Sequence, residues 1–112
     1  MNLISERILT WAKYLDVKFD ETNFDIYVPC CRTDEEKKFV QEELIKRGAL
    51  PLEKLEIGKT YIGCCRNAGE AIWQGDRFCY QRNKFGLTFP ETINHFQNDD
   101  GFDVFVPIKL KK

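Results

Sequence analysis

Residues 77–94 read RFCYQRNKFGLTFPETIN, and the alternation of side chains along this stretch decides the fold class. Two runs of period two separated by a glycine are typical of neighbouring antiparallel strands, which we expect at 77–85 and 87–94 with Gly86 between them. Similar short runs, separated by turn residues, extend in both directions. They predict further strands at 59–66, 69–74 and 102–109. Residues 55–112 are therefore expected to form a five-stranded antiparallel meander, either curled into a small barrel or strongly twisted.

The first half of the chain, residues 1–54, has helical periodicity instead. An amphipathic helix is predicted over about residues 4–15, because apolar side chains recur there at steps of three and four. These side chains belong to Ile4, Ile8, Trp11, Ala12 and Leu15. A second helix is predicted from Thr33 to Arg47, since Thr33 and Glu36 have the spacing of a capping box and Gly48 can supply a left-handed exit.

One edge strand is expected between the two helices. Phe24, Ile26 and Val28 alternate with Asp25 and Tyr27, and the run stops at a proline, which cannot donate to a strand ladder. The complete prediction is an α+β fold in which two helices and this strand precede the five-stranded sheet. The helices are expected to pack on the sheet and cover one face or one mouth of it.

Length and charge limit the classes of function. A chain of 112 residues suits one domain, 1–112, that buries its own core. The formal net charge is −1, with 17 basic and 18 acidic side chains, so the basic surplus that favours nucleic-acid binding is missing overall. No basic region followed by a long apolar run opens the sequence. A cytoplasmic protein with no membrane partner is therefore expected.

The cysteines raise the question of metal or thiol chemistry. There are five, arranged as the vicinal pairs Cys30-Cys31 and Cys64-Cys65 plus Cys79, and the single histidine is His95. Adjacent residues of a strand point to opposite faces, so each pair offers one thiolate to a shared centre, and no C-x-x-C spacing occurs. We expect reduced thiols, no metal and no cofactor. A cysteine nucleophile with His95 as its base stays open as an enzymatic alternative.

Basic and aromatic residues interleave on the predicted strands, which marks a candidate binding face. Its members are Arg66, Trp73, Phe78, Tyr80, Arg82 and Lys84. Along the strand 77–85, the last four share one face, so aromatic rings and cationic ends lie side by side. Such a face suits a protein hot spot, stacked single-stranded nucleic acid or an anionic ligand. The structural interpretation is equally open: the rings are core, and the cations guard a sheet edge.

The second half also resembles a known group of proteins. The residues that carry the likeness are Tyr61-Ile62-Gly63, Cys65-Arg66-Asn67-Ala68, Ala71-Ile72-Trp73, Phe78-Cys79-Tyr80, Arg82, Lys84-Phe85-Gly86 and Asp99-Asp100-Gly101-Phe102-Asp103-Val104-Phe105-Val106-Pro107. Over residues 55–108 the chain resembles small uncharacterised proteins of phages and mobile elements. The resemblance implies an accessory protein that acts in the bacterial cytosol, with no catalytic residues to carry over.

Three functional hypotheses follow, in order. The first is a non-enzymatic accessory protein that binds a host or phage protein, for example as an inhibitor. The second is a small β-barrel that binds nucleic acid through the basic and aromatic face. The third is a cysteine-dependent enzyme using His95.

Overall fold

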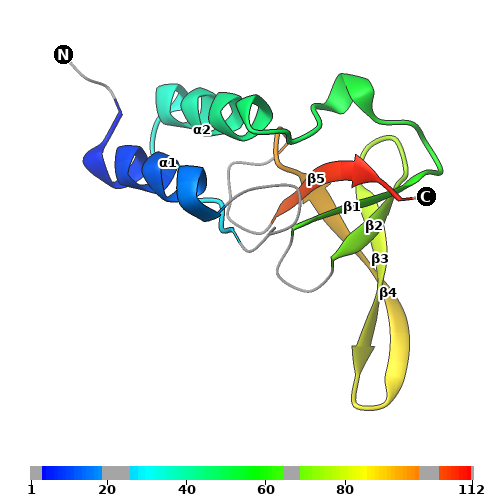
Figure 1. Cartoon of the computed structure of the whole chain (residues 1–112). Coiled ribbons are helices and arrows are strands. Elements are labelled where there is room, and N and C mark those ends of the chain that lie inside the picture. The colour runs from blue at the N-terminus through cyan, green and yellow to red at the C-terminus, as the bar shows by residue number, and fades with distance from the viewer. Residues whose placement is uncertain (1–3, 19–25, 65–68, 99–103, 112) are drawn as a thin grey trace.

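The computed structural model describes residues 4–18, 26–64, 69–98 and 104–111. It confirms the α+β class: two helices lie in the first half and five strands in the second (Figure 1). The elements are α1 (Glu6–Lys18), α2 (Asp34–Lys46), the short 3₁₀ helix η1 (Leu52–Lys54), β1 (Thr60–Cys64), β2 (Glu70–Trp73), β3 (Phe78–Lys84), β4 (Leu87–His95) and β5 (Val104–Leu110).

The five strands follow one another around a ring, and β1 pairs with β5. Four of the five pairings are antiparallel, as expected, but β4 and β5 run parallel. The expectation of an entirely antiparallel sheet is therefore wrong at this point, because side-chain alternation is the same in both kinds of pair and carries no direction. Among the described residues, Asn94–Val104 and His95–Phe105 join β4 to β5, so a short parallel ladder closes a ring that is otherwise antiparallel and is not a regular barrel.

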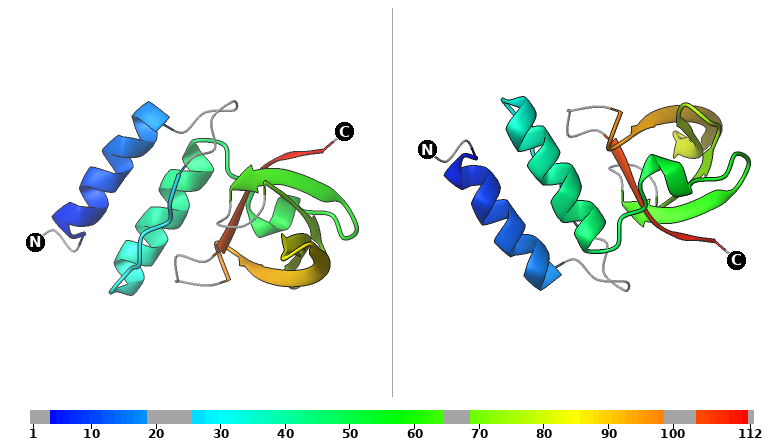
Figure 2. Two further views of the ribbon diagram at one scale, coloured as in Figure 1. Left: turned by 90° about the horizontal axis from the view of Figure 1, so that it is seen from below. Right: turned by 90° about the horizontal axis from the view of Figure 1, so that it is seen from above.

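The inside of the barrel is filled by aromatic side chains. The buried residues of this barrel core are Tyr61, Ala71, Trp73, Phe78, Tyr80, Ile93 and Phe105. The ring centroids of Phe78 and Phe105 lie 4.6 Å apart, and those of Phe78 and Trp73 lie 4.9 Å apart, within the range of favourable aromatic pairs. Leucines of the segment around η1 pack on this cluster, and η1 sits at one mouth of the ring (Figure 2).

A second core lies between the helices and the outer side of β5. Along this strand, Val104 and Val106 belong to the helical core, whereas Phe105 belongs to the barrel core. From the helices, Ile8, Trp11 and Leu15 of α1 and Val40 and Leu44 of α2 complete the helical core. The period-two geometry of β5 thus supplies one wall to each core, and the helices cover the outside of the barrel rather than its mouth.

The helices run parallel, and a polar contact ties them together at each end (Figure 2). At the start, the buried Glu36 carboxylate accepts hydrogen bonds from the backbone N–H and the hydroxyl of Ser5, at 3.0 and 2.5 Å. At the far end, the Arg47 guanidinium donates to the Asp16 carboxylate at 2.6 Å and to the Ala12 carbonyl at 3.2 Å. Both contacts join residues more than thirty positions apart.

The predicted N-cap of α2 is confirmed. Thr33 has extended backbone angles, and its hydroxyl accepts from the N–H of Glu36 at 3.1 Å. The carboxylate of Glu36 reaches back one residue further than in a standard capping box, to the N–H of Arg32 at 3.1 Å. Gly48 has φ +116, which confirms the left-handed exit after the helix.

The edge strand expected over residues 24–28 is wrong for its described part, residues 26–28. Residues 24 and 25 lie outside the described part, and residues 26–31 have no strand pairing. This extended segment instead returns along the helices, and side chains satisfy its carbonyls: the Trp11 indole N–H donates to Tyr27 at 2.6 Å, and Arg7 donates to Cys30 at 2.6 Å. The side chains do alternate, since Ile26 is buried and Tyr27 is exposed, but the buried side packs on the helices and not on a sheet.

The close approach of β1 and β5 gives a first testable prediction. A Cβ atom at Gly63 would lie 2.1 Å from the carbonyl oxygen of Val106, a distance that only a backbone shift can relieve. We expect Gly63→Ala to lower the free energy of unfolding by about 3 kcal/mol, measured by urea denaturation. The matched control is Gly69→Ala, since nothing lies within 4 Å of a Cβ there. Equal stability of the two variants would contradict the close contact.

The buried imidazole of His95 gives a second prediction. Burial lowers its pKa from 6.5 to about 4. The unfolded chain therefore takes up a proton near pH 6.5 while the folded protein stays neutral, so stability is complete above pH 6.5 and falls on acidification. Between pH 6.5 and about 5 the loss should be about 2 kcal/mol in urea unfolding.

His95 is the single histidine of the sequence, which makes the control simple. His95→Gln should show a flat free energy of unfolding across the same pH window, although its stability at pH 7 will be lower. The carboxylates with lowered pKa, Glu36 and Glu91, start from a usual value of 4.5, so their contribution is lost at lower pH. A pH step that persists in His95→Gln would contradict the assignment.

Candidate functional site

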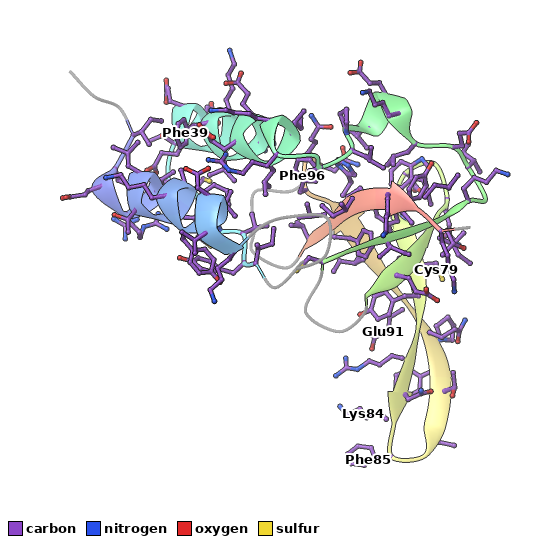
Figure 3. All side chains as sticks on the ribbon, viewed as in Figure 1. Phe39, Cys79, Lys84, Phe85, Glu91 and Phe96 are labelled. Carbon is purple, nitrogen blue, oxygen red and sulfur yellow. The ribbon has the colours of Figure 1, made fainter. Side chains whose placement is uncertain are left out.

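The β3–β4 hairpin extends beyond the barrel as an arm, which we define as residues 81–90 (Figure 1). Its two strands pair from Phe78–Ile93 at the barrel to Lys84–Leu87 at the tip. Figure 3 shows Lys84 and Phe85 at the far end of the arm, away from the helices. Within the arm, only Arg82 and Phe89 are even partly buried. The arm therefore contributes little to either core.

The tip is a two-residue turn with an unusual residue in it. Phe85 has φ 54 and Gly86 has φ 76, the positive values that a type I′ turn needs at both central positions. Asn-Gly is the favoured pair there, because a bulky side chain is strained in the left-handed region. Phe85 is the one described non-glycine residue with positive φ, and it is 91% exposed. A hydrophobic ring thus occupies a strained position where it gains no burial.

Two neighbours make the tip amphipathic. Leu87, directly after the turn, is 67% exposed. The ammonium group of Lys84 lies 5.5 Å from the centroid of the Phe85 ring, at cation–π distance. The arm tip, defined as Lys84, Phe85 and Leu87, therefore presents two apolar side chains and one cation to solvent.

The binding face expected from the sequence divides into two parts. Trp73, Phe78 and Tyr80 are buried in the barrel core, at 4%, 0% and 6% exposure, which favours the structural interpretation for the rings. Arg82 and Lys84 continue the same side of β3 into the arm. Arg66 lies outside the described residues. The structure thus places the rings of β2 and β3 inside the barrel and the two cations of β3 outside it.

A hydrogen-bonded group marks the place where the core meets the arm. The Tyr80 hydroxyl donates to the Glu91 carboxylate at 2.7 Å, and Arg82 donates to the same carboxylate at 3.1 Å. The Tyr80 hydroxyl and then the Arg82 guanidinium lower the pKa of Glu91, against the effect of desolvation. Arg82 is therefore held across the base of the arm. Lys84, two residues further along β3, is the cation of this face that lies near the end of the arm (Figure 3).

In the part of the chain that the structure covers, the cysteines and His95 do not assemble into a centre for metal or thiol chemistry. Cys30, Cys31, Cys64 and Cys79 are not in disulfide bonds, and among the described residues no three His, Cys, Asp or Glu side chains gather to hold a metal ion. His95 is fully buried. Its Nε2 lies 2.9 Å from the Leu50 carbonyl, and its Nδ1 accepts from the N–H of Gln97 at 3.0 Å. Both ring nitrogens thus hold the backbone in place.

Sequence reasoning included Lys84 of the arm tip in the candidate face but missed the turn that exposes Phe85 and Leu87. The expected strand 77–85 included Phe85 as its last residue, whereas the structure ends β3 at Lys84 and places Phe85 in the turn. A signal was present, because Gly86 follows Phe85 between two alternating runs, as in a two-residue hairpin. An aromatic residue before that glycine obscured the pattern.

No protein-family model, no curated protein and no solved structure matches this chain. In the described part of the chain, neither helix has both the length and the apolar character needed to cross a membrane.

The division between core rings and tip ring can be tested with one chemical change at two places. Phe78→Ala should lower the free energy of unfolding by about 4 kcal/mol, because it empties the centre of the barrel. Phe85→Ala should change it by less than about 0.5 kcal/mol, as surface substitutions do. Thermal or urea unfolding measures both. A comparable loss in the two variants would mean that Phe85 packs against the fold.

Proposed function

We propose that the protein is a non-enzymatic accessory protein of the phage or mobile-element type that binds a host or phage protein, for example as an inhibitor. The arm tip is the proposed contact. The resemblance of residues 55–108 supplies the phage context, and the arm supplies the physical argument.

The observation that carries the proposal is the exposed ring of Phe85 in a left-handed turn. Folding gains nothing from it, since the ring is 91% exposed and its backbone conformation is costly for a bulky residue. Aromatic side chains are the ones most enriched at the energetic centres of protein interfaces. Beside it, Leu87 adds apolar area and Lys84 adds a charge that can select a partner. A projecting hairpin can insert such a group into a pocket of another protein.

Nucleic-acid binding through the basic and aromatic face is less well supported. Single-stranded binding needs rings on which bases can stack, but Trp73, Phe78 and Tyr80 are buried. It also needs cations free to meet phosphates. Three of the basic residues in the barrel half already hold carboxylates: Arg77 pairs with Asp76, Arg82 with Glu91, and Lys111 with Glu70. The arm tip, with two exposed apolar side chains beside one cation, suits a protein partner better than a nucleic acid.

Phe85→Asn is the variant that tests the function most sharply. Asn adopts the left-handed conformation more easily, so the variant should unfold at the same free energy as the parent or with a gain of about 0.5–1 kcal/mol. It should nevertheless lose the partner in affinity capture from bacterial lysate. Loss of binding with retained or raised stability cannot come from misfolding. Capture should be repeated after nuclease treatment.

Val17→Asn is the matched control. Val17 is 78% exposed on α1, so this change removes an exposed apolar side chain from a helix that lies apart from the arm (Figure 1). It should retain the partner. If Phe85→Asn captures the same protein as the parent, the arm tip is not the contact. If nuclease abolishes retention, the partner is nucleic acid and the proposal is wrong.

A further inference from the structure

Strand β3 is longer than the strand beside it. It pairs with β4 at all seven of its positions, from Phe78 to Lys84, but with β2 only at Phe78–Trp73 and Cys79–Ile72. Beyond Cys79 the two strands separate. Among the described residues, the last part of β3 therefore has a neighbouring strand on one side and an open edge on the other.

The alternation of an antiparallel ladder determines which backbone groups face that open edge. In a two-residue hairpin the closing pair, Lys84–Leu87, exchanges both hydrogen bonds, and the next pair along exchanges none. The non-bonded pairs are then Asn83–Thr88 and Gln81–Pro90. The N–H and C=O groups of Gln81 and Asn83 thus point away from β4. On the opposite edge, Pro90 has no N–H to offer.

A hollow lies where the strands part. It has a volume of about 370 Å³ and is lined by residues 69–72 of the β2 side, residues 79–81 of β3, and Thr60 and Lys111. Ile72 is 44% exposed there and Cys79 is partly exposed, so the hollow offers two apolar contacts on the outer face of the sheet, beside the ion pair of Glu70 and Lys111. Arg82 and Lys84 lie on the other face of β3, because they alternate with Gln81 and Asn83.

Charge decides between a second copy of this chain and a different strand. If two copies paired antiparallel through this edge, the symmetric register centred on Arg82 would place arginine opposite arginine. The register centred on Asn83 would place Arg82 opposite Lys84. Like charges directly opposite one another destabilise a pair of strands. A strand with a carboxylate opposite Lys84 is favoured instead, because Arg82 already pairs with Glu91.

We infer that the open edge of β3 receives an extended segment of a partner protein as an added β-strand, with an acidic side chain toward Lys84 and apolar ones toward Ile72 and Cys79 in the hollow, while Arg82 keeps its ion pair with Glu91. This inference rests on the proposed function, because it names the kind of protein segment that the arm binds. Backbone hydrogen bonds to Gln81 and Asn83 supply affinity, and the alternation of acidic and apolar residues supplies selectivity.

The test uses a fluorescein-labelled peptide of four Val-Glu repeats, with a Val-Lys peptide of equal length as its control, in fluorescence anisotropy. The parent should bind the Val-Glu peptide saturably and the Val-Lys peptide at least tenfold more weakly. Asn83→Pro removes one outward N–H from the open edge and should weaken binding of the Val-Glu peptide about tenfold.

Thr88→Pro is the matched control, since Thr88 lies opposite Asn83 in the same non-bonded pair. The Thr88 hydroxyl donates to the Asn83 side chain at 2.5 Å, so both variants lose this hydrogen bond. Both also place a proline at an outward position, as Pro90 already does in β4. Asn83→Pro removes a donor from the open edge of β3, whereas Thr88→Pro removes one from the outer edge of β4. Thr88→Pro should therefore bind the peptide as the parent does.

Hydrogen exchange on the unaltered protein gives a result that does not depend on the folding of either variant. Saturation with the Val-Glu peptide should slow exchange of the Gln81 and Asn83 amides and leave the Thr88 amide unchanged. No binding of the peptide, equal binding of the Val-Lys peptide, or equal weakening by the two proline variants would each overturn the inference.

These outcomes are separable from failure of the proposed function. A captured protein that is lost with Phe85→Asn, together with no peptide binding, would keep the proposed function and remove the added strand. Peptide binding that Asn83→Pro weakens and Thr88→Pro does not, together with an empty capture, would keep the added strand and remove the proposed function.

Discussion

Strand β5 is the constraint on which both hydrophobic cores depend. Its side chains alternate between Val104 and Val106, which face the helices, and Phe105, which faces the inside of the barrel. The same strand pairs with β1 on one side and with β4 on the other. Its close approach to β1 requires a glycine at position 63, where the backbone of β5 occupies the space of a side chain. A shift of β5 by one residue would exchange the two cores.

Much of the fold could be predicted because it follows from local periodicity. Both helices and all five strands lie close to the positions that side-chain patterns indicate, and the cap at Thr33 and the exit at Gly48 follow from local chemistry. The direction of β5 relative to β4 could not be predicted, because side-chain alternation is the same in parallel and antiparallel pairs. The strand expected over residues 24–28 is wrong at residues 26–28 for a related reason: alternation shows that one side is buried, without showing what buries it.

The candidate site was harder to predict because it depends on where the barrel ends. Phe78, Tyr80, Arg82 and Lys84 lie on one face of β3, as the sequence indicates, but the barrel covers only the first two of them. No local pattern states where a strand leaves its neighbour, since that depends on the length of β2 and on the tertiary course of the chain. The exposure of Phe85 and the open edge beside Gln81 and Asn83 both result from this separation.

The parallel arrangement of α1 and α2 has an electrostatic consequence. Parallel neighbours place two positive helix ends together and two negative ends together, which is unfavourable because each helix carries a dipole. Glu36 lies between the two amino-terminal ends and accepts from Ser5 and Arg32, so one carboxylate offsets two positive ends. At the other end the Arg47 guanidinium donates to the carbonyls of Ala12 and Glu43, one from each helix. Loss of either charged group would therefore weaken the compensation of two helix dipoles at once, leaving it to the remaining first-turn acids and last-turn bases of each helix.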